Sequence, residues 1–314
     1  MRFAVVMDPL GAIRMETDTS YAMIEEAWRR GWETLHLEPK DMFVRDGVAL
    51  AFARRIRKAS PFDLDPPALV RLGEIDVIAM RKDPPFDMEY VFSTYILETA
   101  RDQGALVFND PRGLRDANEK FAATRFSRHM PPTLVSKDVG VILDFLNEHP
   151  HAILKPLDWM GGASIFHLRK DDPKHEALLD SIVAKPGRTV MVQKYLPEID
   201  TAGDKRIFMI DGEPIEETFA RFPKSPGLPA NAARGGSARA STLTPKDREI
   251  CADLAPYLKA HGLIFVGFDV IGDYLTEINV TSSTGIRFIQ KLFGTNPLER
   301  LFDGLERHRS LHGR

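Results

Sequence analysis

The chain has 314 residues, of which 43% are hydrophobic and 28% charged, which is the composition of a folded globular protein rather than a disordered or fibrous one. Its 42 lysines and arginines nearly balance its 45 aspartates and glutamates, so a net charge of −3 provides no basic field for nucleic acid or an anionic membrane. The single cysteine excludes an internal disulfide, and the apolar run at residues 3–7 is too short for a signal or a membrane span. We therefore expect a cytoplasmic protein that acts on small molecules, with two domains or three small ones.

The first part of the chain alternates between strand and helix patterns. Asp18 is a candidate N-cap, Gly31 a helix stop, and Asp46-Gly47 a hairpin turn. The expected elements are a strand at 2–7, a helix at about 20–30, strands at 33–37 and 75–80, a helix at about 89–103 and a strand at 105–108. This alternation predicts an open α/β sheet.

A polar stretch at 109–120 marks a boundary, and Pro131-Pro132 ends the helix that follows it. The expected elements of the next part are strands at 151–157, 164–168 and 190–195, a tight turn at Gly161-Gly162 and a helix at 173–184. Antiparallel signals follow: a strand at 206–210, a turn at 211–212, a strand that reaches residue 222, a long loop at 223–240, a helix from 244 to 262 and a hairpin at 263–280. A compact α+β lobe and an antiparallel lobe are the prediction.

The hairpin at 263–280 carries three side chains with oxygen ligands. Glu277 and Asn279 are two residues apart on its second strand, so their side chains point to the same face, and Asp269 on the first strand can join them. Oxygen ligands suit Mg²⁺, which usually takes one or two carboxylates, waters and substrate phosphates. The alternative is that the trio forms the solvated face of an edge hairpin.

Lys155 lies on an otherwise apolar strand, and a buried lysine is costly unless an anion compensates its charge. Lys120, taken alone, is an ordinary surface charge of a helix. Gly161 and Gly162 would let backbone N–H groups approach a phosphate closely, although such a pair is also typical of a plain hairpin turn. The pair fits neither the P-loop nor the dinucleotide fingerprint.

The strand at 190–196 could present backbone groups to a purine edge, with Asp204 bound to ribose hydroxyls; a buried strand with a solvated tip is the alternative. Guanidinium groups bind phosphate and carboxylate in bidentate fashion, but most arginines of a chain lie on its surface. Three are candidate anion clamps: Arg206, Arg221 and Arg287. Histidine spacing and the absence of a Gly-x-Ser-x-Gly elbow argue against zinc enzymes and hydrolase triads.

Taken in order, these segments resemble the bacterial-type glutathione synthetases, which are ligases of the ATP-grasp superfamily. The resemblance extends through residues 6–9, 18–23, 80–87, 115–120, 153–162, 203–206 and 263–281. It implies an α/β and α+β ATP-grasp fold with an N-terminal open α/β substrate domain at 1–117 and an ATP-grasp domain at 118–314. That second domain would consist of a central lid lobe at 118–200 and a C-terminal lobe with the metal site at 201–314.

The resemblance also implies roles for the candidate residues. The nucleotide would be held by Lys120 and Lys155 at its phosphates, by the loop of Gly161 and Gly162 over them, by Gln193, Tyr195 and Leu196 at adenine, and by Asp204 at ribose. Mg²⁺, or Mn²⁺ in its place, would bind Asp269, Glu277 and Asn279. Arg206 would steady the transferred phosphoryl group, and Arg221 and Arg287 would clamp phosphate or substrate carboxylate.

The implied reaction joins glycine to γ-glutamylcysteine with ATP and gives glutathione, ADP and phosphate through an acyl phosphate. Catalysis would consist of positioning and electrostatics, with lid closure to exclude water. A homotetramer is also implied. Dipeptide-binding groups are expected on first-domain loops near Asp8, residues 18–20 and Arg81, because ligands gather at the carboxyl ends of the strands in open α/β sheets.

Three positions depart from the family pattern. Trp159 replaces a glycine before the glycine pair, Ser283 replaces the proline of Thr-Ser-Pro-Thr, and Pro229-Ala230 stands where an arginine is expected. These departures bear on the acceptor amine and on the shielding of the acyl phosphate. Two alternatives therefore remain: a related carboxylate–amine ligase with another acceptor or acid, and a catalytically idle nucleotide-binding protein with a regulatory role.

Overall fold

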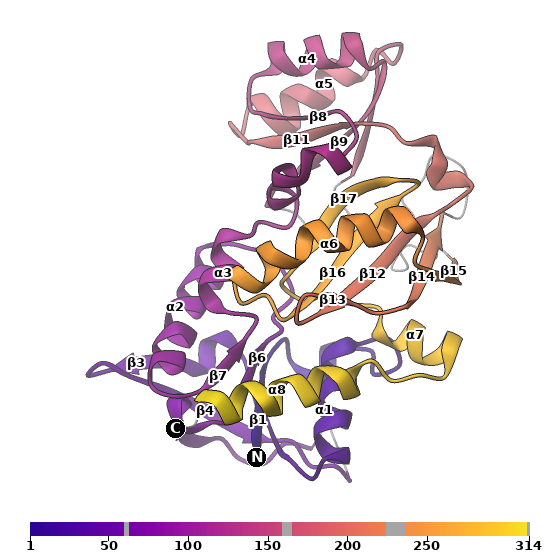
Figure 1. Ribbon diagram of the computed structural model, residues 1–314. Coiled ribbons are helices and arrows are strands. Elements are labelled where there is room, and N and C mark those ends of the chain that lie inside the picture. Colours follow the sequence, from indigo (N-terminus) through magenta and orange to yellow (C-terminus); the bar gives the residue numbers. More distant parts are fainter. Residues whose placement is uncertain (60–62, 159–164, 224–236, 313–314) are drawn as a thin grey trace.

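The computed structural model describes residues 1–59, 63–158, 165–223 and 237–312. Three β-sheets follow one another along the chain, with helices packed on each of them (Figure 1). Among the described residues, no helix is long and apolar enough to cross a membrane.

The first sheet has a parallel centre, in the order β2-β1-β6-β7, which antiparallel strands extend beyond β2. Helices cover both faces, since α1 packs on one side of β1 and α2 on the other. The elements are β1 (Arg2–Val6), α1 (Thr19–Arg29), β2 (Glu33–Leu37), β3 (Met42–Arg45), β4 (Val48–Arg55), β5 (Ala68–Arg71), β6 (Val77–Met80), α2 (Met88–Asp102) and β7 (Leu106–Phe108). The predicted open α/β sheet is confirmed.

Local signals in this part act as expected. The side chain of Asp18 accepts a hydrogen bond from the N–H of Tyr21 at 2.7 Å and caps α1. Asp46 and Gly47 both have positive φ angles and form the turn between β3 and β4.

The second sheet is antiparallel, in the order β10-β9-β11-β8, and two helical segments cover one face of it (Figure 1). Its elements, with the connection from the first sheet, are α3 (Pro111–Asp116), η4 (Phe121–His129), β8 (Thr133–Ser136), α4 (Val139–Glu148), β9 (His151–Pro156), β10 (Phe166–Arg169), α5 (His175–Leu179), η5 (Asp180–Ala184) and β11 (Val190–Lys194). Strand β8 and helix α4 were not expected. The predicted Gly161-Gly162 turn lies outside the described residues.

The third sheet is antiparallel, in the order β15-β14-β12-β16-β17, and α6 runs along it. Its elements are β12 (Asp204–Ile210), β13 (Glu213–Pro214), β14 (Glu217–Phe222), β15 (Ser237–Thr242), α6 (Pro245–Ala260), β16 (Phe265–Ile271) and β17 (Tyr274–Asn279). The prediction of a loop throughout 223–240 is wrong at its end, because residues 237–240 belong to β15 and pair with β14. The other residues of that loop, 224–236, lie outside the described residues.

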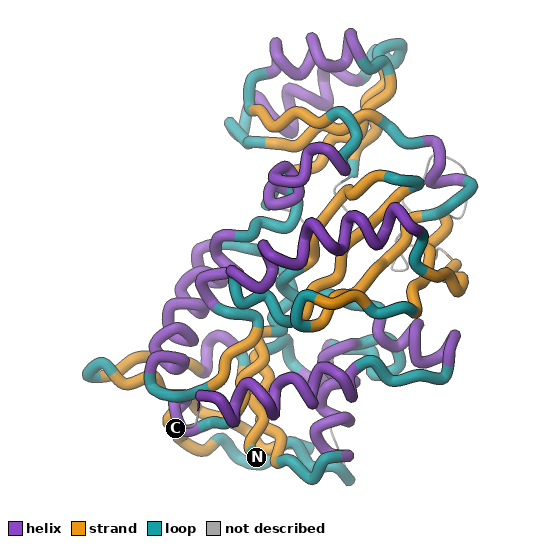
Figure 2. Tube along the Cα trace, in the orientation of Figure 1, coloured by secondary structure: helices purple, strands orange, loops and turns teal. Residues whose placement is uncertain are grey.

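Two unpredicted helices complete the chain, α7 (Ile286–Phe293) and α8 (Leu298–His312). A Cβ atom at Gly285, just before α7, would lie 2.4 Å from the ring of Phe219, and φ there is +123°, so glycine is required. Helix α8 returns to the first sheet and packs against α1, where Arg30 donates to Asp303 at 2.7 Å and to Glu306 at 3.1 Å. Both chain ends therefore lie at the first sheet (Figure 2).

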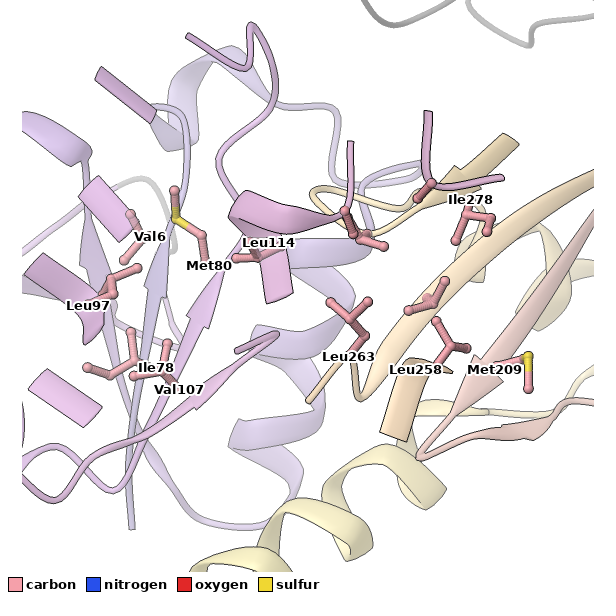
Figure 3. Close-up of a cluster of buried hydrophobic side chains, with 14 of the residues drawn as sticks. Val6, Ile78, Met80, Leu97, Val107, Leu114, Met209, Leu258, Leu263 and Ile278 are labelled. Atoms are coloured by element: carbon pink, nitrogen blue, oxygen red, sulfur yellow. The ribbon is translucent and has the colours of Figure 1, made fainter. Parts of the chain in front are cut away.

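The hydrophobic core joins the first and third sheets. Figure 3 shows Met80 of the first sheet near Leu114 of α3, and Leu263 and Leu258 beside the third sheet. A second such cluster joins α1 and α8 to β12 and α7. The second sheet has a cluster of its own, whose buried members lie within residues 142–192, although Met191, Val135 and Leu157 pack on the first cluster. The domain boundaries at 117 and 200 stay a prediction.

Candidate active site

Charged side chains gather where β9 and β11 of the second sheet face β12, β16 and β17 of the third. Segment 118–120 runs between them: the Asn118 amide donates to the carbonyl of Leu157 at 2.9 Å, and Lys120 Nζ lies 3.4 Å from Glu277 Oε1. The side chain of Lys120 is only 7% exposed, so this charge is not the ordinary surface lysine that the sequence alone suggested.

The three candidate metal ligands converge on the β16–β17 hairpin as predicted. Asp269 and Glu277 are direct cross-strand partners, and Asn279 is opposite Gly267. The Asn279 amide donates to Asp269 Oδ2 at 3.3 Å. The pairing shifts register just after Asp269, and Asp269 is buried while Glu277 and Asn279 are half-buried. The trio is therefore not the solvated face of an edge hairpin.

Two arginines bind the carboxylate of Asp269. Arg206 donates from Nε to Oδ1 at 2.5 Å and from Nη2 to Oδ2 at 2.9 Å, which is a bidentate pair. Arg221 Nη2 lies 2.9 Å from Asp269 Oδ1 and donates to Asp204 Oδ2 at 2.5 Å. The register explains the meeting, because Arg206 is opposite Asp269 and Asp204 is opposite Arg221.

The two carboxylates respond differently to this setting. Burial works to raise the pKa of Asp269, but the guanidinium groups of Arg206 and Arg221 outweigh it and hold that pKa well below its usual range. Burial raises the pKa of Asp204 to about 6, and the charge of Asp269 adds to that rise while Arg221 opposes it. Asp269 is therefore the carboxylate that stays ionised.

Lys155 points from β9 toward the same centre. Its ammonium group donates to Gln193 Oε1 at 2.7 Å, and the Gln193 amide donates to the hydroxyl of Thr133 at 3.2 Å. Burial lowers the pKa of Lys155, and the charge of Lys120 adds to this, while Glu277, Asp204 and Asp269 oppose it. Lys155 is half-buried, on the less buried face of β9, and its lowered pKa shows that its charge is partly desolvated.

Tyr195 and Leu196 follow the end of β11, which is an inner strand of the second sheet. The ring of Tyr195 stacks on His151 with centroids 4.0 Å apart and an interplanar angle of 22°, and it lies 5.5 Å from the ring of His167. Register places His151 on the same face of β9 as Lys155. Tyr195 therefore borders the face from which Lys155 projects, while Leu196 is buried.

Arg287 does not join the cluster. It lies on α7, and its Nη2 donates to Glu25 of α1 at 2.6 Å while Nη1 donates to Gln290 at 3.1 Å. Gly161 and Gly162 lie outside the described residues.

Arg81, at the end of β6, lies on one of the first-domain loops named as candidates for dipeptide binding. It is buried, and its guanidinium donates to the hydroxyl of Ser20 and to the carbonyls of Thr281 and Ser283. A buried guanidinium is stable only when its donors are satisfied within the protein, and these three acceptors satisfy Arg81. The expectation that dipeptide-binding groups lie on the loops near Asp8, residues 18–20 and Arg81 stays a prediction.

Glu119 was missed by sequence reasoning although it lies next to Lys120. Its Oε1 accepts hydrogen bonds from the N–H groups of Val280 and Thr281 at 2.8 and 2.9 Å and from the Thr281 hydroxyl at 2.8 Å. Its carbonyl also accepts from Ile278 N–H at 2.9 Å. Burial and the nearby charge of Glu277 raise the pKa of Glu119. Glu119 thereby fixes Lys120 beside β17, and the Asn118-Glu119-Lys120 run was its only signal in the sequence.

The chemistry of these donors fits a hard divalent cation. Asp269 and Glu277 supply carboxylate oxygens, and Asn279 keeps its amide oxygen because its amide nitrogen is the group that contacts Asp269. The neighbouring lysines and arginines fit a polyanion, since Mg²⁺ sites of this kind are completed by phosphates.

Comparison with known families covers most of the chain. Residues 1–115 match prokaryotic glutathione synthetase, N-terminal domain, and residues 119–294 match prokaryotic glutathione synthetase, ATP-grasp domain. The chain is 46% identical over 309 residues to the glutathione synthetase of Pseudomonas aeruginosa, with 97% of each chain covered. It is 44% identical over 320 residues to that of Nitrosomonas europaea, with 98% of each covered.

Solved structures share the fold at low sequence identity. D-cycloserine synthetase DcsG is 16% identical with a TM-score of 0.65, over 96% of this chain and 100% of that one. An ATP-grasp ligase associated with ribosomal peptides in Chryseobacterium gregarium is 15% identical with a TM-score of 0.67, over 98% and 97% of the two chains. The predicted ATP-grasp fold is confirmed. The chain is an ATP-dependent ligase and belongs to the prokaryotic glutathione synthetase family.

Proposed function

We propose that this ligase joins glycine to γ-glutamylcysteine and gives glutathione, ADP and phosphate. The observation that carries the proposal is the convergence of Lys120, Lys155, Arg206 and Arg221 on the carboxylates of one hairpin, within a chain whose full-length relatives are named glutathione synthetase. Such a centre suits the transfer of a phosphoryl group, in which positioning and charge neutralisation supply most of the catalysis.

In the proposed site Lys120 and Lys155 bind the phosphates of ATP. Lys155 occupies a position where burial lowers its pKa, and a bound phosphate would compensate its positive charge. Adenine would lie along the end of β11, beside Gln193, Tyr195 and Leu196, and Asp204 would accept hydrogen bonds from the ribose hydroxyls. The stacking of Tyr195 on His151 supports this placement because it puts aromatic rings beside the end of β11.

Asp269, Glu277 and Asn279 would hold Mg²⁺, with Mn²⁺ as the alternative. When bound, such an ion supplies positive charge that neutralises the transferring phosphoryl group. Arg206 and Arg221 already lie against Asp269, so their guanidinium groups are placed to bind phosphoryl oxygens as well. A substrate contact by Arg287 would require its pair with Glu25 to open.

The proposed mechanism proceeds through an acyl phosphate. The carboxylate of the dipeptide attacks the γ-phosphoryl group, ADP leaves, and the amine of glycine then displaces phosphate from the acyl carbon. Water would hydrolyse this intermediate, so the second sheet must close over the site as a lid. The separate core of residues 142–192 supports movement of this sheet as a unit.

Isotope transfer tests this mechanism. With ¹⁸O in the dipeptide carboxylate, one labelled oxygen should appear in the released phosphate, and the product mass should equal that of glutathione. Unlabelled phosphate would refute the acyl phosphate. A substrate panel tests the two substrates. If the enzyme forms a product from another amine or another acid instead, that compound is the substrate in place of glycine or the dipeptide, and the ligase chemistry is unchanged.

We also propose a homotetramer in the cytoplasm. Three side chains at a spacing of four and three residues form an exposed apolar stripe on α2, namely Met88, Phe92 and Tyr95, each at least half exposed. Sedimentation should show a tetramer that Phe92→Glu weakens. The one cysteine, Cys251, is free and buried, which supports a reducing compartment.

A further inference from the structure

Ser283, in the loop between β17 and α7, is buried and is held by two arginines from different parts of the chain. Its hydroxyl accepts a hydrogen bond from Arg206 Nη1 at 3.3 Å. Its carbonyl accepts one from Arg81 Nη2 at 2.8 Å. Side chain and backbone of one serine therefore connect two guanidinium groups.

Ser283 contacts a different edge of the Arg206 guanidinium from the edge that contacts Asp269. Nε and Nη2 of Arg206 donate to Asp269, whereas Nη1 donates to the hydroxyl of Ser283 and to the carbonyl of Thr284 at 3.0 Å. The guanidinium is a rigid planar fork, so a hold on its Nη1 edge sets the plane of the whole group. This hold would persist if the carboxylate of Asp269 turned toward a cation.

The neighbouring strand is shaped to admit the serine hydroxyl. A Cβ atom at Gly267 of β16 would lie 2.2 Å from Ser283 Oγ and 3.0 Å from Cδ of Arg206. Glycine therefore leaves the space in which the hydroxyl and the arginine stem meet.

Arg81 links the same serine to the first sheet. It follows β6, where its N–H donates to Val6 at 2.8 Å, and its Nε donates to the hydroxyl of Ser20 in the first turn of α1 at 3.1 Å. The carbonyl of Thr281 accepts from its Nη1 at 3.3 Å. A buried guanidinium with three fixed acceptors connects the carboxyl end of β6 to the loop after β17.

We propose that Ser283 is a positioning residue that orients Arg206 for phosphoryl transfer and couples it, through Arg81, to the first sheet. The inference rests on the proposed function, because the role of Arg206 is taken from it. A proline at this position, as in the family pattern, would keep the carbonyl for Arg81 and remove the hydroxyl for Arg206.

A double-mutant cycle tests this role. Ser283→Ala should lower kcat about tenfold, the loss of one hydrogen bond to a charged group, and should change the KM for ATP less than about twofold. Arg206→Lys should lower kcat further, and Ser283→Ala should add little in that background because Lys lacks the fork. The control is Ser93→Ala on α2, which removes another buried hydroxyl, one that donates to the Glu89 carbonyl at 2.9 Å.

A binding measurement makes the test independent of the acceptor amine. Ser283→Ala should weaken the Mg²⁺–ADP–aluminium fluoride complex, which mimics the transferring phosphoryl group, about tenfold, and should leave ADP binding unchanged. Equal affinity of wild type and variant for that complex would overturn the proposal, as would additive effects in the cycle. A wild-type enzyme that binds the complex but makes no glutathione would instead refute the proposed function and leave this test in force.

Discussion

Individual charged side chains show what the active site is built to receive. Lys155 carries a pKa lowered by burial, and Asp269 carries a pKa held low by two guanidinium groups. A lysine in such a place weakens the free protein, since its charge has lost much of its hydration. The desolvated charge of Lys155 thus lowers the stability of the free protein, and a bound phosphate group would compensate that charge.

Replacing Lys155 by methionine tests that interpretation. The variant keeps the length of the side chain and loses its charge, so ATP should bind at least about tenfold more weakly. Its thermal unfolding without ATP should occur at an equal or higher temperature, because the desolvated charge is gone. The control is Lys194→Met, one position from Gln193 and exposed to solvent, which should leave ATP affinity unchanged. Equal ATP affinity of Lys155→Met and wild type would contradict the assignment.

Asp204 predicts a dependence of stability on pH. Its folded pKa of about 6 lies above the value of 3.8 that applies when the chain is unfolded. Between those values the folded state binds more protons, so stability should fall as pH rises from about 4 to about 6. Relative to Asp204→Asn, wild type should lose about 2 kcal/mol of unfolding free energy over this range in urea titrations. If the difference in unfolding free energy between wild type and Asp204→Asn stays constant over this pH range, the raised pKa of Asp204 is contradicted. Asp273→Asn in the β16–β17 turn serves as control.

Local elements place these residues, and much of this level is predictable from sequence. Asp46-Gly47 forms its turn and Thr244 its helix cap because both are decided by neighbours in the chain. Helix α4 was missed despite a cap at Asp138 and buried side chains at Ile142 and Leu146. Strand β8, just before α4, was also missed. It is an edge strand whose residues are all half-buried, so its sequence shows only a weak alternation of apolar and polar residues.

Parts of the site were beyond sequence reasoning for a different reason. Glu119 meets Thr281, and Arg81 meets Ser283, across 162 and 202 residues of chain. No local pattern marks such pairs, because only the packing of distant segments against the loop after β17 creates them. The convergence of Asp269, Glu277 and Asn279 was predictable, since a hairpin brings its members together by short-range register.

The capping box of α6 offers a test at this level. The N–H of Asp247 donates to the Thr244 hydroxyl at 3.1 Å, and the N–H of Thr244 donates to Asp247 Oδ2 at 2.8 Å. Thr244→Ala should lower the unfolding free energy by about 1 kcal/mol in urea titration. Thr201→Ala, at an exposed turn, should cost clearly less, and equal losses would show that the cap contributes nothing special.

At the scale of the whole molecule, the first and third sheets form one body. Their side chains share two hydrophobic clusters, and α8 returns from the third sheet to pack on α1 (Figure 1). Asn109 adds a polar link, since its amide donates to the carbonyls of Phe265 and Val280, each at 2.8 Å. This arrangement ties the β16–β17 hairpin to the first sheet, while the second sheet has a core of its own.

Asn109→Ala should therefore destabilise the folded chain strongly. The side chain also accepts a hydrogen bond from Phe265 N–H at 2.8 Å. Its removal therefore leaves three buried backbone groups without their hydrogen-bond partner. We expect a loss of about 3 kcal/mol or more in unfolding free energy. Asn147→Ala, exposed on α4, is the matched control, and a similar small loss for both variants would show that Asn109 does not join the sheets.

The central claim is that this chain uses ATP to join glycine to γ-glutamylcysteine. The most direct measurement is coupled ADP release from Mg²⁺-ATP and γ-glutamylcysteine, with and without glycine, followed by the mass of the product. We predict that glycine drives ADP release and that glutathione accumulates in equal amount. ADP release that does not depend on glycine, or no release at all, would contradict the claim.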